Sequence, residues 1–163
     1  MTPAAPAPIV ALEASGLGQA MRQWLWLYPS VEIVHVTGIA LLFGSIAVLD
    51  LRLLGFSRGV SVRKLASHVL PWTLASFLLI VPSGVMMFTA HATDFITNPA
   101  FAVKVSLILA AFANAGIFHA GVFRGAERWD LGVAPPLAAR AAGALSLLLW
   151  ISVIACGRLL AYF

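Results

Sequence analysis

The chain has 163 residues, of which 61% are hydrophobic and only 10% are charged, and its mean hydropathy is +0.98. A soluble domain of ordinary composition carries about 25% charged residues, so this chain has too few charges to cover a water-facing surface and is predicted to be an integral membrane protein in contact with the lipid bilayer. The net charge of +4 does not indicate a nucleic-acid partner, because the basic residues flank apolar segments, as they do in membrane proteins.

Residues 1–28 come before the first predicted membrane span. The stretch MTPAAPAP at their start is expected to form a tail, because it lacks the charged start of a signal peptide and the apolar core that would follow. Residues 9–28 are apolar but are interrupted by Gly16 and Gly18. This pattern predicts a short helix that lies along the membrane surface.

Residues 29–163 contain four apolar segments, each long enough to cross a membrane, which takes roughly 20 residues. The connections between these segments are short and leave no room for a second domain. The sequence therefore predicts a single all-α domain, an integral membrane four-helix bundle with antiparallel neighbours. The predicted spans cover residues 30–54, 69–90, 100–123 and 137–163.

The basic residues are distributed unevenly between the two ends of these spans. Seven lie at the end that carries the connection between the first two spans: Arg52, Arg58, Arg63, Lys64, Arg124, Arg128 and Arg140. Three lie at the opposite end: Arg22, Lys104 and Arg158. Cytoplasmic loops of membrane proteins carry the excess of Lys and Arg. We therefore expect a multi-pass protein of the bacterial inner membrane with both termini on the outer, periplasmic side.

The four histidines fall in two pairs, one near each predicted face of the membrane. His35 and His91 lie near the outer face, and the two belong to different spans. His68 and His119 lie near the cytoplasmic face, again on different spans. Membrane helix bundles hold haem b between paired imidazoles of facing helices. The pattern therefore predicts that these four histidines bind one or two haem b groups.

Charged residues near these histidines are the expected partners of the cofactor. Cations stabilise haem propionates through charge-assisted hydrogen bonds, and a carboxylate can orient a ligating histidine through its second ring nitrogen. Glu32 shares a helix face with His35 and is expected to orient it. Lys104 is expected to extend outward and pair with Glu32 or Asp94. The full set of expected partners is Glu32, Arg63, Lys64, Lys104 and Arg124.

The outer pair of histidines has an alternative interpretation as a site for a copper, zinc or iron ion. The first span offers Glu32 and His35, and the second span is followed by His91 and Asp94. Two imidazoles and two carboxylates suit these metals. Met87 adds a thioether, which favours copper(I), although filling a core is the commoner role of methionine.

Two other polar side chains within the predicted spans, Asp50 and Asn114, have expected roles. Asp50 is expected to pair with Arg52 or Arg63 at the cytoplasmic end of the first span. Asn114 is expected to form a hydrogen bond between two helices. No Ser-His-Asp order, phosphate-binding loop or nucleotide fingerprint is visible in the sequence.

Three stretches of the chain resemble a family of short bacterial inner-membrane proteins of unknown function. They are WLYPSVEIVHVTGIALLFGSIAVLDLRLLG, NPAFAVKVSLILAAFANAGIFH and GALSLLLWISVIACGRLLAY. The likeness extends from Trp24 onward and implies a protein of four spans. The span count and the paired histidines are also similar to those of cytochrome b561-like four-helix b-type cytochromes, and copper-resistance membrane proteins of the D type look similar as well. These two likenesses imply haem-based electron transfer and metal handling, respectively.

Three functions follow from these patterns. The first is a b-type haem protein that relays electrons within or across the membrane, in the manner of an oxidoreductase, to or from a quinone or another redox partner. The second is a metal-binding membrane protein. The third is a structural subunit without a cofactor. Small residues at helix-packing spacing, such as Gly121 with Gly125, also allow a homo-oligomer.

Overall fold

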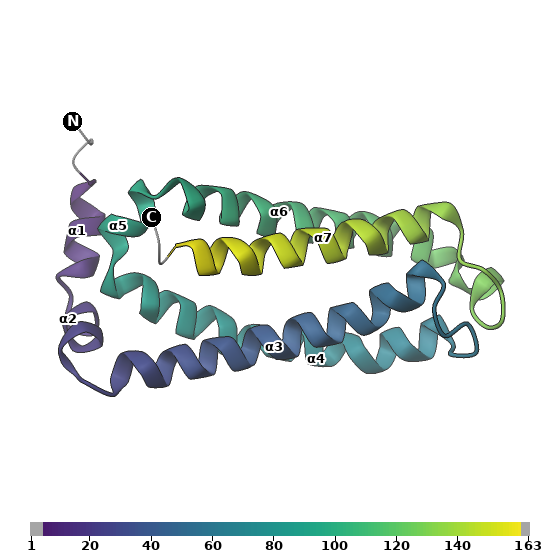
Figure 1. Ribbon diagram of the computed structural model, residues 1–163, viewed down its shortest axis with the longest axis horizontal. Coiled ribbons are helices and arrows are strands. Elements are labelled where there is room, and N and C mark those ends of the chain that lie inside the picture. The colour runs from purple at the N-terminus through teal and green to yellow at the C-terminus, as the bar shows by residue number, and fades with distance from the viewer. Residues whose placement is uncertain (1–4, 161–163) are drawn as a thin grey trace.

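The computed structural model describes residues 5–160, and within that range every regular element is a helix (Figure 1). Four long helices run antiparallel along the molecule, and each is long and apolar enough to cross a membrane. This confirms the predicted all-α membrane bundle. The four helices are α3 (Leu27–Leu54), α4 (Val62–Ala90), α6 (Pro99–Ala120) and α7 (Leu137–Leu159).

The N-terminal segment forms two short helices, α1 (Ala7–Glu13) and α2 (Gly16–Gln23), where the sequence predicted one. The helices separate at Ser15, whose hydroxyl caps α2 by accepting a hydrogen bond from the Gly18 amide at 3.2 Å. Helix α1 also begins inside the predicted tail. Pro8 lies in its first turn, where a proline is tolerated because the first amides of a helix have no intrahelical partner.

Helix α4 begins at Val62, earlier than the predicted residue 69. The hydroxyl of Ser61 accepts a hydrogen bond from the Lys64 amide at 3.1 Å, and an Asp130 carboxylate oxygen accepts one from the Arg63 amide at 2.9 Å. These hydrogen bonds satisfy the first amides of α4 and let the helix begin before the apolar segment. Hydropathy alone does not predict this. Helix α6 ends at Ala120, and the 3₁₀ helix η1 (Val122–Trp129) follows it.

Helix α3 packs against α4 and α7, and α6 packs against α7. Two glycines allow the close approaches: a Cβ on Gly38 would lie 2.7 Å from Ile80 Cγ1 of α4, and one on Gly143 would lie 3.1 Å from the Asp50 carbonyl oxygen of α3. In the described part of the chain, the backbones of α4 and α6 do not come into contact. Aromatic side chains bridge these two helices instead, with Phe77 against Phe112 and Phe88 against Phe101.

The two ends of the bundle are built differently. At the clasp end, α1, α2 and the short helix α5 (Ala92–Thr97) lie across the bundle, and the last turn of α7 is at the same end (Figure 1). The loop end carries the α3–α4 connection and η1. There the buried Arg52 donates from Nε to the Val60 carbonyl at 2.7 Å and from Nη2 to the Asp130 carbonyl at 2.9 Å.

Candidate functional site: a cavity within the membrane bundle

A cavity of about 340 Å³ lies between the four long helices, in the half of the bundle nearer the loop end. Its walls are mainly apolar and include the rings of Phe77, Phe112 and Trp150. The exposed lining residues include Leu74 on α4 and Gly116 on α6, the two helices whose backbones stay apart. The cavity therefore opens between α4 and α6, toward the lipid.

Asp50 is the acidic residue of the cavity wall and is only 5% exposed. Its Oδ2 atom has no hydrogen-bond partner within residues 5–160, while Ser146 of α7 interacts with the carboxyl group. An ionised carboxylate without a partner is costly inside a membrane, so burial favours the neutral acid. The neutral acid carries one O–H group that can donate a hydrogen bond.

The prediction that Asp50 pairs with Arg52 or Arg63 was wrong. Residues two positions apart on an α-helix point about 200° apart, so Asp50 faces the cavity while Arg52 extends to the loop carbonyls. Arg63 forms an ion pair with Glu127 of η1.

His119 lines the same cavity from the last turn of α6. Its Nδ1 lies 2.9 Å from the Ala115 carbonyl oxygen, and because a carbonyl only accepts, Nδ1 carries the proton. The rings of Phe118 and Phe123 contact the imidazole, each with its centroid 5.2 Å away. Nε2 is buried and has no partner among the described residues. In a neutral imidazole this nitrogen is a hydrogen-bond acceptor.

Asn114 also lines the cavity, and its side-chain amide is already occupied. Nδ2 donates to the Ala142 carbonyl oxygen of α7 at 3.0 Å. This is the predicted hydrogen bond between two helices. It ties α6 to α7 on one side of the cavity. Among the described lining residues, Asp50 and His119 are then the ones with buried polar side-chain atoms that lack a hydrogen-bond partner.

His35 lies between α3 and α4, away from the cavity lining. Its Nδ1 is 3.1 Å from the Ile80 carbonyl oxygen and 2.9 Å from the Ser83 hydroxyl, and its ring packs over Gly84. Ser83 precedes His91 by eight residues on α4, a rise of about 12 Å along the helix. The structure therefore places His35 well below the level of His91.

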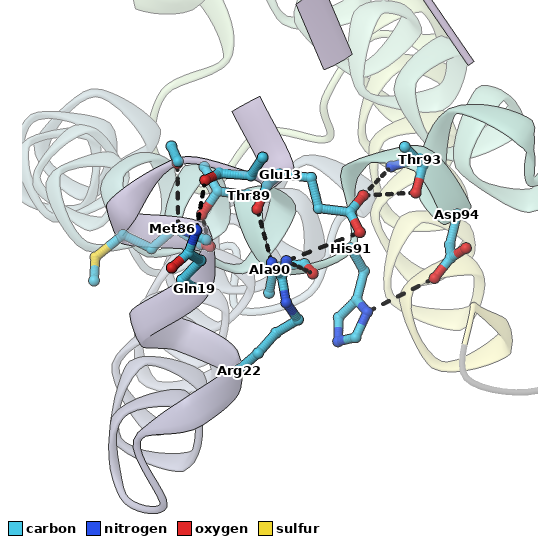
Figure 2. Close-up of polar contacts among 12 residues, drawn as sticks. Glu13, Gln19, Arg22, Met86, Thr89, Ala90, His91, Thr93 and Asp94 are labelled. Carbon is cyan, nitrogen blue, oxygen red and sulfur yellow. Dashed lines mark hydrogen bonds and ion pairs between the residues drawn. The ribbon is translucent and has the colours of Figure 1, made fainter. Parts of the chain in front are cut away.

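His91 and Asp94 lie at the clasp end, where their side chains are 48% and 79% exposed (Figure 2). His91 Nδ1 is 3.7 Å from an Asp94 carboxylate oxygen, and the ring makes edge contacts with Tyr28 and Phe95. Glu32 is exposed on α3. Nothing in this arrangement brings His91 next to His35.

His68 is exposed and does not line the cavity that His119 lines. On α4 the lining begins at Leu70, and a residue two positions earlier points about 200° away from it. Among the predicted cationic partners, Lys104 is half-buried, and its Nζ lies 3.4 Å from where a Cβ on Gly157 of α7 would be. Arg63, Lys64 and Arg124 are exposed at the loop end.

The alternative metal site is not assembled in the described residues, where no three His, Cys, Asp or Glu side chains gather closely enough to hold a metal ion. Met87 is partly buried and packs against a cluster that contains Met21, Val31 and Ala90. Core filling, the commoner role of methionine, accounts for this position.

Sequence reasoning did not identify the cavity. The available signal was an acidic residue inside an apolar span, at Asp50, whose basic neighbour Arg52 offered a simpler explanation. Ser146 and His119, which line the same cavity as Asp50, come from two other helices, and no spacing along the chain connects them.

No curated protein and no solved structure is similar enough to this chain to match it. A family model described as a family of unknown function, DUF6644, matches residues 11–163. The match includes all four long helices and every residue of the cavity wall. The chain therefore belongs to the DUF6644 family.

Proposed function

We propose that this membrane protein binds a lipid-soluble quinone in the cavity and takes part in electron transfer within the membrane. The observation that carries the proposal is that two buried, unpartnered atoms, Asp50 Oδ2 and His119 Nε2, share one apolar cavity open to lipid. The apolar walls favour a ligand from the bilayer. The two polar atoms favour a ligand whose oxygens gain and lose protons. A quinone has both properties.

The size and lining of the cavity support a planar ring. Its volume of about 340 Å³ is at the small end of the usual range for ligand sites, about 300–1,000 Å³. The rings of Phe77, Phe112 and Trp150 offer flat apolar surfaces against which a planar ring can pack.

The corresponding reaction is the oxidation of a quinol to a quinone, with the loss of two protons and two electrons. His119 Nε2 accepts one proton, and the second leaves to water at the loop end. The two electrons pass in turn to a one-electron carrier, a haem or iron–sulfur protein of the same membrane. In this reaction class the protein is an oxidoreductase component.

Haem b is the second candidate for the cavity. A ligating histidine usually donates its other ring N–H to a carbonyl or carboxylate, and His119 makes such a bond to Ala115. Of the four histidines, His119 lines the cavity, so it would hold the haem iron from this chain, and the haem would supply one-electron chemistry. The exposed positions of His68 and His91 give no support to ligation by two histidines of this chain.

The test is to purify the protein in mild detergent and titrate it with a short-chain ubiquinone analogue, following tryptophan fluorescence. We expect saturable quenching, because Trp150 lines the cavity. Gly116→Leu should weaken binding by about tenfold or more, because it fills the entrance with a side chain. Gly44→Leu is the matched control, since Gly44 also has open space around it but does not line the cavity.

A visible spectrum and metal analysis of the same sample separate the other candidates. A Soret band that His119→Ala abolishes and His68→Ala retains would favour haem over quinone. Stoichiometric copper, zinc or iron without a Soret band would favour a metal-ion protein. Quenching that does not saturate, or that Gly116→Leu and Gly44→Leu affect equally, would contradict the quinone proposal.

A further inference from the structure

The cavity offers a ligand one hydrogen-bond donor and one acceptor on different helices. The donor is the O–H of neutral Asp50 on α3, and the acceptor is Nε2 of His119 on α6. His119 is held in this tautomer because its Nδ1 proton is used in the bond to the Ala115 carbonyl. The donor and the acceptor of the site are therefore set before any ligand enters it.

The two redox forms of a quinone match this pair differently. A quinol hydroxyl both donates and accepts, so one hydroxyl can donate to His119 Nε2 and the other can accept from Asp50. A quinone carries only acceptors, so its carbonyl can accept from Asp50 but meets a second acceptor at His119. To donate to that carbonyl, His119 would have to move its proton to Nε2 and lose the bond to Ala115.

We infer that the cavity selects the reduced, dihydroxy form of its ligand, the quinol, over the quinone. The inference rests on the proposed function, since it names which form of the ligand the same site prefers. A site built to pair with a hydroxyl rejects an analogue that lacks it, because buried polar groups are then left unpaired. For one neutral acceptor we expect a preference of about tenfold in Kd.

The first experiment measures how tightly the wild type and its variants bind a short-chain ubiquinol and the corresponding ubiquinone. The quinol is kept reduced by excess reductant. The wild type should bind the quinol about tenfold more tightly. His119→Phe keeps a ring between Phe118 and Phe123 but removes Nε2, so the two affinities should come within about twofold of each other. Asp50→Asn retains an N–H donor and should keep the preference, as should the control His68→Phe.

A second measurement uses the wild type alone and does not depend on any variant folding. The dimethyl ether of the quinol has the same ring but no O–H group. We expect it to bind as weakly as the quinone. If it binds as tightly as the quinol, or if quinol and quinone bind equally, the selection is overturned while the proposed function stands. If none of the three ligands binds, the proposed function itself is wrong.

Discussion

Gly18 lies at a close approach of helix α2 to helix α4. A Cβ at this position would lie 2.4 Å from the Glu13 carbonyl oxygen and 2.8 Å from the Thr89 carbonyl oxygen of α4. Both contacts are with backbone atoms, which cannot rotate away as a flexible side chain can. Helix α2 can pack against α4 at this distance only because residue 18 has no side chain.

We therefore expect Gly18→Ala to destabilise the docked N-terminal segment by about 1–3 kcal/mol, the usual cost of overpacking. Thermal unfolding in detergent measures the change, and limited proteolysis within α1 shows whether the segment is released. Gly16→Ala is the control in the same helix, because nothing lies within 4 Å of a Cβ there. Equal losses of stability in the two variants would show that the close approach at Gly18 does not stabilise the docked segment.

At the scale of elements, α1 and α2 hold the junction between α4 and α5 (Figure 2). Arg22 of α2 donates from Nη1 to the Ala90 carbonyl oxygen at the end of α4, at 2.8 Å. Glu13 of α1 accepts hydrogen bonds from the Thr93 amide at 2.9 Å and the Thr93 hydroxyl at 2.6 Å. His91, the residue before α5, makes no side-chain cap, so Glu13 caps that helix from a distant part of the chain.

The hydrogen bonds from Thr93 lower the pKa of Glu13 below its ordinary value of 4.5, with Arg22 adding a smaller effect of the same sign. A lowered pKa in the folded state gives stability that is present above the ordinary value and is lost as the pH falls through the folded pKa. We therefore expect the protection of α1 and α5 against hydrogen exchange, measured relative to the intrinsic exchange rate at each pH, to be high at neutral pH and to fall as the pH falls below about 4.5.

Glu13→Gln should already be less protected than the wild type at neutral pH, and the two should converge as the pH falls through the lowered folded pKa of Glu13, where the wild-type carboxyl becomes protonated. Glu32→Gln is the control, because Glu32 is an exposed carboxylate on α3, outside the two helices whose exchange is measured. A difference between wild type and Glu13→Gln that stays unchanged at low pH would contradict the role of the ionised carboxylate.

At the scale of the whole molecule, the even number of long helices places α1 and the last turn of α7 at the same end, the clasp end (Figure 1). The basic residues gather at the loop end, so the loop end is proposed to face the cytoplasm. The sequence has one cysteine, Cys156. With Cys156 replaced by serine, a membrane-impermeant maleimide added to intact cells should label Ala11→Cys and not Gly59→Cys. Labelling of Gly59→Cys alone would reverse the orientation.

The candidate site shows how far the sequence could be read. The sequence singled out His119 as a candidate site residue, which the structure places in the cavity wall, and it correctly predicted that Asn114 links two helices. It grouped the histidines by their depth in the membrane, since position along a span gives depth. It could not give the direction in which each side chain points around the helix, and that direction places His119 at the cavity and leaves His68 exposed.

The sequence by itself determined the membrane class, the number of long helices and their antiparallel order. Four apolar segments of membrane-spanning length, joined by short connections, allow few other arrangements of the chain. The tertiary structure alone decided which helices pack together. Glycines such as Gly38 and Gly143 bring α3 close to α4 and α7, while α4 and α6 stay apart. That gap creates the cavity and joins Asp50 with His119. The pairing depends on helix rotation and contact between distant segments, which the order of residues along the chain does not specify.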